Sequence, residues 1–242
     1  METKQVQEVK QAYRDKHGEE VTNDFLVEEE KVNKICCIPV KQGVRWWNFM
    51  AIPLVPCTVM LLTTYVNAQT IFLLRNDEYF GVEEDKLGTI SSTLVLVSYP
   101  GAIFGTLSAG YFYDILGRRV TLFTAFLLGS ILVFCIPYTA PSVFPTLMIV
   151  RISIQLSLSA PAANPLLADY VHKDSIGKAA VFIALGFIIG EVLSMGVLFN
   201  VTANFSPETA FLIVACVGAV FSMSFLILVK EPQLRSNEVE MD

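Results

Sequence analysis

The stretch that decides the fold is Gly110-Tyr-Phe-Tyr-Asp114-Ile-Leu-Gly117-Arg118-Arg119, a short polar interruption between two long apolar runs. Gly117 permits a tight turn that a side chain would obstruct. Asp114 is predicted to end one helix, and Arg118 and Arg119 to begin the next. The two arginines can bind the carboxylate or an anionic lipid surface. A generic charged turn explains these charges, but it explains the full Gly-Asp-Gly-Arg-Arg spacing less well.

Apolar runs continue outward from this turn in both directions. The chain is 53% hydrophobic and only 17% charged, whereas soluble domains are about 25% charged. A helix needs about 20 residues to cross a ~30 Å hydrocarbon core, and irregular backbone is not tolerated against lipid. We therefore predict an all-α membrane protein whose six transmembrane helices lie near residues 47–73, 87–112, 120–139, 143–168, 178–200 and 209–230.

The basic residues indicate how these helices are oriented. Fourteen of the 17 Lys and Arg fall in the N-terminal tail, the Gly117 turn, the loop at residues 172–178 and the C-terminal tail. The opposite loops hold only Arg75 and Lys86. Because short cytosolic loops are rich in Lys and Arg, we expect both termini to be cytosolic. The chain would then consist of a polar cytosolic tail (1–45), a six-helix bundle (46–231) and a second cytosolic tail (232–242).

Several classes of protein are excluded by what the sequence lacks. It has no G-x-x-x-x-G-K-S/T loop for nucleotide phosphates and no H-E-x-x-H metal motif. It has no basic stripe of the kind that binds nucleic acid. Its five cysteines follow neither a disulfide framework nor metal-ligand spacing. We therefore expect no enzyme, no cofactor, no metal and no nucleic-acid partner.

The Gly110–Arg119 stretch resembles the signature loop between the second and third helices of the major facilitator superfamily. Three later stretches, Arg151–Gln155, Asn164–Tyr170 and Val229–Pro232, are similar to that family's fourth helix, its end, and the close of its sixth helix. The resemblance covers about residues 47–232 in the right order. It implies a cytosolic loop latch, whose residues in this chain would be Gly110, Asp114, Gly117, Arg118, Arg119, Asp169 and Glu231.

The sequence also departs from the family's pattern. Gln155 stands where the family usually has a glycine, and Ile176 where an arginine is common. The family has twelve helices, and six are predicted here. Its six-helix half consists of two inverted three-helix repeats, of which Gly101-x-x-x-Gly105 and Gly186-x-x-x-Gly190 are weak traces. The general frequency of glycine in membrane helices explains either pair about equally well.

Two full charges, Arg151 and Glu191, fall well inside the apolar runs. Such residues usually pair with each other or face a water-filled cavity. Counted from the outer ends of their helices, they lie at similar depths. We hypothesise that they form an ion pair or jointly line a polar cavity, which Gln155, Asn67 and Gln69 extend. The alternative is a buried pair that only fixes helix packing.

Together these features predict a transporter that moves a small solute by alternating access and is driven by a gradient. Its expected partners are membrane lipid, a small-molecule or ion substrate, and a second six-helix half, supplied by another copy or another chain. The alternative is a non-transporting structural or regulatory membrane subunit derived from a transporter half. A pure scaffold has little reason to keep Arg151, Gln155 and Glu191 in its apolar core, so the sequence favours transport.

Overall fold

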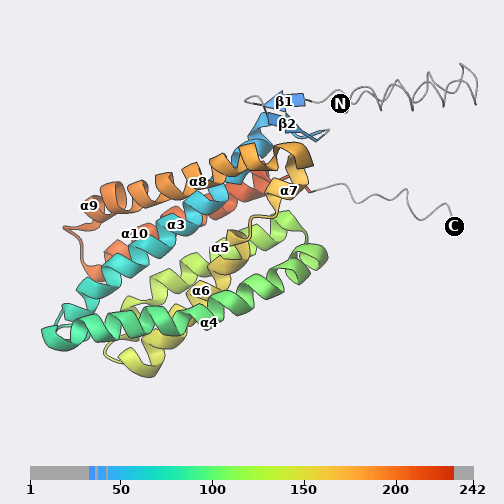
Figure 1. Ribbon diagram of the computed structural model, residues 1–242. Coiled ribbons are helices and arrows are strands. Elements are labelled where there is room, and N and C mark those ends of the chain that lie inside the picture. Colours follow the sequence, from blue (N-terminus) through green and yellow to red (C-terminus); the bar gives the residue numbers. More distant parts are fainter. Residues whose placement is uncertain (1–32, 36–37, 42, 232–242) are drawn as a thin grey trace, which may run out of the picture.

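The computed structural model describes residues 33–35, 38–41 and 43–231, and within them the six predicted membrane helices are confirmed. All six are long and apolar enough to cross a membrane. Figure 1 shows them as a bundle whose helices run side by side between two ends. The end that holds Gly117, Lys173 and Lys230 is called the basic end below.

The helices follow the predicted order with small shifts at their boundaries. The first three are α3 (Trp46–Arg75), α4 (Glu84–Leu116) and α5 (Arg118–Cys135). The fourth span contains a π-helical turn (Val143–Leu147), α6 (Met148–Ala162) and α7 (Leu166–Tyr170). The fifth contains α8 (Ile176–Val192), a second π-helical turn (Leu193–Leu198) and α9 (Phe199–Thr202). The sixth is α10 (Pro207–Leu228), and short 3-10 turns occupy Pro137–Thr139 and Lys173–Ser175.

The fourth span is interrupted where a continuous helix was predicted over 143–168. Helix α6 ends at Ala162, and Asn164 adopts a left-handed backbone conformation with φ of 40°. Asn164 precedes Pro165, and the residue before a proline is disfavoured in the right-handed helical region. The Asn164 side chain donates from Nδ2 to the Ile52 carbonyl at 3.0 Å, so the break is fastened to α3.

The two glycine pairs noted in the sequence have equivalent roles in packing. A Cβ atom on Gly101 or Gly105 of α4 would collide with Ile152 or Leu156 of α6. A Cβ atom on Gly186 or Gly190 of α8 would collide in the same way with the backbone of Pro53 or Cys57 of α3. The second helix therefore packs closely on the fourth, and the fifth on the first. This exchange is the relation expected of two inverted three-helix repeats.

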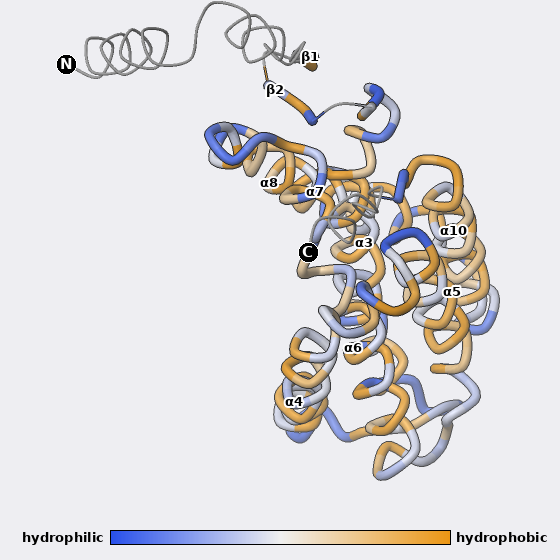
Figure 2. The backbone as a smooth tube through the Cα atoms, turned by 90° about the vertical axis from the view of Figure 1, so that its right-hand side faces the viewer, coloured by the Kyte–Doolittle hydropathy of each residue, from blue (hydrophilic) through white to orange (hydrophobic). Residues whose placement is uncertain are grey.

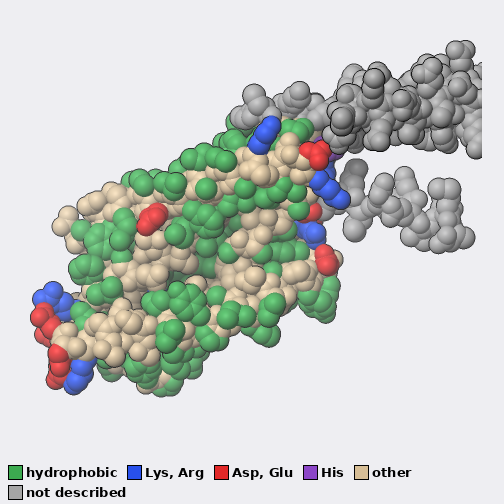
Figure 3. Space-filling model, viewed as in Figure 1, with side chains coloured by type: hydrophobic (Ala, Val, Ile, Leu, Met, Phe, Trp, Pro, Cys, Tyr) green, Lys and Arg blue, Asp and Glu red, His purple; other side chains and the backbone are tan. Residues whose placement is uncertain are grey.

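The surface of the bundle is that of a protein surrounded by lipid. Figure 2 shows long hydrophobic stretches along the helices, with hydrophilic residues mainly near their ends. In Figure 3 the charged side chains gather at the two ends, and one isolated acidic patch lies on the hydrophobic middle. Large apolar side chains face outward, including Leu107 (79% exposed) and Ile227 (83% exposed).

The chain before α3 also packs against the bundle. Strands β1 (Asn33–Ile35) and β2 (Ile38–Val40) pair antiparallel, and Val40 forms a β-bridge with Val171. Ile38, Val40 and Val44 are buried. The predicted tail 1–45 is thus described only from Asn33 onward, and there it contributes to the core. The predicted tail 232–242 lies outside the described residues.

Candidate functional site

The turn between α4 and α5 holds a cluster of charged groups centred on Arg118. Its guanidinium donates from Nε to Asp169 Oδ2 at 3.0 Å and from Nη1 to Asp114 Oδ1 at 3.1 Å. Nη1 also donates to the Tyr113 carbonyl at 2.8 Å. Arg118 therefore joins the end of α4 to α7, which follows it by about fifty residues in the chain.

Glu231 completes this cluster from the segment beyond α10. Its two carboxylate oxygens accept hydrogen bonds from the backbone N–H groups of Arg118, at 3.0 Å, and Arg119, at 2.7 Å. These N–H groups belong to the first turn of α5, where a helix has no internal acceptors for them. A negative charge there is also favoured by the helix dipole. Glu231 therefore caps α5 across more than a hundred residues of sequence.

Gly117 makes that approach possible. Its φ of +82° and ψ of 165° lie in a region essentially restricted to glycine. A Cβ atom built on Gly117 would lie 2.7 Å from Glu231 Oε1. The position therefore requires glycine both for the backbone conformation and for the space that the carboxylate occupies.

Further hydrogen bonds hold the segment after α10 in place. The Tyr170 hydroxyl accepts from the Lys230 N–H and donates to the Lys230 carbonyl, both at 2.8 Å. Asn48 Nδ2 donates to the Leu228 carbonyl at 2.7 Å. Sequence reasoning missed Tyr170 and Asn48. Each is a polar side chain at the polar end of an apolar run, and that position was the available signal.

The structure brings together five of the predicted latch residues and separates the other two. Asp114, Gly117, Arg118, Asp169 and Glu231 form the cluster, which we call the Gly117 cluster. Arg119 joins it only through its backbone N–H, and its side chain is exposed. Gly110 is exposed on α4, and apart from the local backbone of its own helix no described atom lies within 4 Å of the Cβ position.

Inside the membrane span, Arg151 pairs with Asn67 and not with Glu191. Arg151 of α6 is 6% exposed, and its Nη2 donates to Asn67 Oδ1 of α3 at 2.5 Å. Glu191 is exposed on α8 and takes part in none of the ion pairs of the described chain. The hypothesised ion pair is therefore wrong.

The reason is the packing of α8. Its Gly190 lies against Cys57 of α3, whereas Arg151 lies against Asn67 of the same helix. Ten residues separate those two positions, which is about 15 Å at 1.5 Å per residue. Helices α6 and α8 also contact different neighbours, mainly α4 and α3 respectively. Counting depth from the helix ends missed this offset.

The other predicted polar residues lie around Arg151. Gln155 follows it by one turn of α6 and is half-buried, Asn67 is exposed, and Gln69 is half-buried. No hydrogen bond joins the side-chain amide of Gln155 or Gln69 to another described residue. A guanidinium has five N–H donors, and within the described chain that of Arg151 makes one hydrogen bond, to a neutral amide. This cation therefore retains donors for a further polar or anionic group.

The described residues contain no group of three or more His, Cys, Asp and Glu side chains able to hold a metal ion.

Comparison with protein families gives a match to the sequence model of the Major Facilitator Superfamily over residues 48–241. The chain belongs to the major facilitator superfamily. Together with its six apolar helices, this makes it a multi-pass membrane protein of a transporter family.

A curated relative points in the same direction. The chain is 35% identical over 74 residues to the inorganic phosphate transporter PT2 of Toxoplasma gondii (strain ATCC 50861 / VEG). The match covers 28% of this chain and 13% of the relative. No solved structure gives a significant match.

Proposed function

We propose that this major facilitator chain acts as one six-helix half of a secondary transporter for a small anionic solute. The observation that carries the proposal is the state of Arg151. It is a buried cation whose described partner is a neutral amide, with no carboxylate at ion-pair distance in the described chain. An arginine in a membrane span usually meets a counter-charge or a water-filled path. An anionic solute passing Arg151 would supply that charge.

The Gly117 cluster supports an alternating-access mechanism for this half. It fastens α5, α7 and the segment after α10 to one another, so the basic end would move as one rigid body. The side chain of Asp114, a member of the cluster, is exposed, and so are Gly110 and the side chain of Arg119 beside it. They would contact the second half as it rocks, with the basic end in the cytosol.

The second half would cover the polar groups that this half leaves open. Asn67 and Glu191 are exposed although both lie in membrane spans. Exposed polar groups in hydrocarbon are costly, so a facing bundle or a water-filled path between the bundles would stabilise them. The membrane spans that contain α4 and α8 are the two least buried. In their most apolar stretches 17% and 22% of the residues are buried, against 67% for the span of α3. Such exposed helices leave room for a second half to pack against them.

One observation favours the alternative of a structural subunit. The Arg151–Asn67 hydrogen bond links α6 to α3 and could serve packing alone. The two functions differ in what they require of the charge. A packing role needs a donor to Asn67, which Gln at position 151 also provides, whereas anion binding needs the cation.

The test is uptake of labelled inorganic phosphate and a panel of small organic anions into proteoliposomes. We expect uptake of at least one anion, lost in Arg151→Gln and retained in part by Arg151→Lys, with thermal stability close to that of the wild type. Lys178→Gln removes an exposed charge from the first turn of α8, at the basic end, and serves as the control. Two samples are compared, one with this chain alone, which can pair with itself, and one with this chain together with a second six-helix half from another chain. The proposal is overturned if neither sample takes up any anion. Uptake unaffected by Arg151→Gln would also overturn it.

A further inference from the structure

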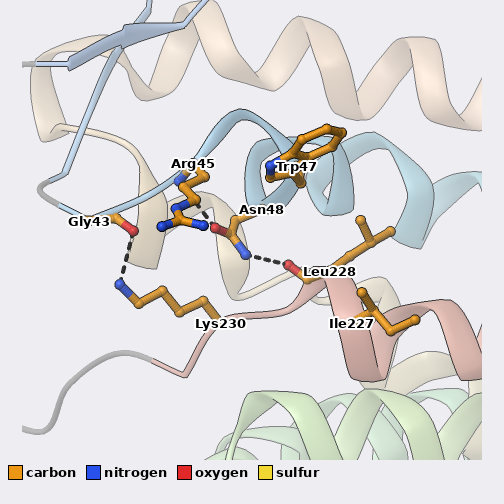
Figure 4. A pocket seen from close by; sticks show the side chains of 7 residues that line it. All are labelled: Gly43, Arg45, Trp47, Asn48, Ile227, Leu228 and Lys230. Atoms are coloured by element: carbon orange, nitrogen blue, oxygen red, sulfur yellow. Dashed lines mark hydrogen bonds between the residues drawn. The ribbon is translucent and has the colours of Figure 1, made fainter.

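A pocket of about 610 Å³ lies at the basic end, between the start of α3 and the end of α10 (Figure 4). Neither the Gly117 cluster nor the Arg151 site uses it. Its volume is within the range of small-ligand sites. It is lined by Gly43, Arg45, Trp47, Asn48, Ile227, Leu228 and Lys230.

The pocket is held in shape by hydrogen bonds between its own walls. Asn48 accepts from the Arg45 N–H at 3.1 Å and donates to the Leu228 carbonyl at 2.7 Å. Lys230 Nζ donates to the Gly43 carbonyl at 2.9 Å. A Cβ atom on Gly43 would lie 2.8 Å from that nitrogen, so the bare backbone lets the lysine approach. The walls are thus joined before any ligand binds.

One side of the pocket is cationic. Figure 4 shows Arg45 and Lys230 on the same side of it, next to the first turn of α3. No carboxylate in the described chain forms an ion pair with either residue. The Lys230 ammonium has three N–H donors, and one of them binds the Gly43 carbonyl. The N-terminus of α3 adds the positive end of a helix dipole. This side of the pocket fits a phosphate group.

The other side is apolar and continuous with the lipid-facing surface. Trp47 is 54% exposed and Ile227 is 83% exposed, although both lie within membrane-spanning helices. Tryptophan at the end of a membrane helix is typical of the headgroup level of the bilayer. A water-soluble phosphate compound would gain nothing from these surfaces, whereas a lipid uses both sides of the pocket at once.

We propose that this pocket binds one anionic membrane phospholipid, with its phosphate between Arg45 and Lys230 and its acyl chain along Trp47 and Ile227. A zwitterionic lipid would bind less tightly, because its own cation opposes the two basic residues. The proposal does not depend on transport, since it concerns only the outer surface of this half.

The chain has two tryptophans, Trp46 and Trp47, whose rings lie beside each other, and Trp47 lines the pocket. Tryptophan fluorescence therefore makes the test direct. In the full-length Trp46→Phe variant all tryptophan fluorescence comes from Trp47. The variant is reconstituted in phosphatidylcholine vesicles containing either brominated phosphatidylglycerol or the same fraction of brominated phosphatidylcholine. We expect the brominated anionic lipid to quench Trp47 more strongly than its share of the bilayer accounts for.

Neutralising the pocket should remove that preference. We expect Arg45→Gln and Lys230→Gln each to lower the relative affinity for the anionic lipid by about five-fold. This is the contribution that one basic residue typically makes to binding at an anionic bilayer surface. The matched control is Lys173→Gln with Lys178→Gln, which removes two charges from the same end away from the pocket. Equal losses in the pocket and control variants would overturn the proposal, because they indicate a diffuse surface charge. Absence of any anionic preference would overturn it, as would displacement of the lipid by soluble glycerol phosphate.

Discussion

The carboxylate of Glu231 occupies the space that a side chain at position 117 would need, 2.7 Å from the Cβ position of Gly117. The glycine and the acid lie more than a hundred residues apart in the sequence, and the position of each depends on the other. Without Glu231 the first turn of α5 would lose two acceptors, and without glycine Glu231 would be excluded from it.

Gly117→Ala is therefore expected to destabilise the protein by about 1–3 kcal/mol, the usual cost of forcing a side chain into such a backbone region. Thermal unfolding in detergent is the measurement. Gly110→Ala is the control, since its Cβ would meet no described atom and alanine is favoured over glycine inside a helix by roughly 0.5–1 kcal/mol. Equal destabilisation by both changes would contradict the geometry described for Gly117.

The two acidic partners of Arg118 should contribute differently to stability. Asp169 is mostly buried, with its side chain 19% exposed, whereas the Asp114 side chain is 75% exposed. Exposed ion pairs contribute little because water and salt screen them. A double-mutant cycle with Arg118→Gln is expected to give a coupling near 1 kcal/mol for Asp169→Asn and close to zero for Asp114→Asn. The reverse order would show that Asp114 is the dominant partner.

Charge exchange between Arg151 and Glu191 should fail to restore function or stability. Since these residues pack about 15 Å apart along α3, Arg151→Glu and Glu191→Arg together should be no better than the worse single change. Arg151→Gln with Asn67→Ala provides the comparison, and there the two effects should be non-additive. Rescue by the double reversal would restore the ion-pair hypothesis.

Stability should decrease at high pH through Tyr79, in the loop between α3 and α4. Burial and the hydrogen bond that its hydroxyl donates to Glu208 raise the pKa of Tyr79 from 10 to about 12. Because the folded state favours the neutral phenol, the stabilisation is full below pH 10 and is lost as the pH rises through 12. Absorbance titration of the wild type minus Tyr79→Phe should place this ionisation near 12. A difference titration centred at pH 10 would contradict the contact.

The proposed orientation is open to labelling from either side of the membrane. In a variant without native cysteines, Lys173→Cys should react with an impermeant reagent only from the cytosolic side. Glu78→Cys, in the loop at the opposite end of the bundle, should react only from the other side. The opposite pattern would reverse the orientation inferred from the basic residues.

The sequence predicted the helices and much of the charged cluster because both depend on local composition or a short motif. Apolar runs must cross lipid as helices. The spacing of the charged residues and the glycine between Asp114 and Arg119 fits only a few kinds of turn between helices. The structure also explains the glycine pairs. Gly101 with Gly105, and Gly186 with Gly190, each allow the backbone of a neighbouring helix to approach closely.

What the sequence could not supply was the relative height of helices that are not consecutive. Arg151 and Asn67 were both named as candidates, yet their pairing depends on how far α6 slides along α3, and no local pattern encodes that displacement. The β-bridge between Val40 of β2 and Val171 was also missed. It joins residues more than a hundred positions apart, and local sequence patterns do not predict such contacts.

The bonds made by Lys230 and Glu231 constrain the length of the connection beyond α10. Between Leu228, fixed by Asn48, and Glu231, fixed on α5, only two residues intervene, and Tyr170 holds the second of them by both backbone groups. One inserted or deleted residue here would shift each of these groups away from its acceptor or donor. Any segment fused or spliced after α10 must therefore begin beyond Glu231, and a mechanical pull on that segment would reach α3, α5 and α7 together.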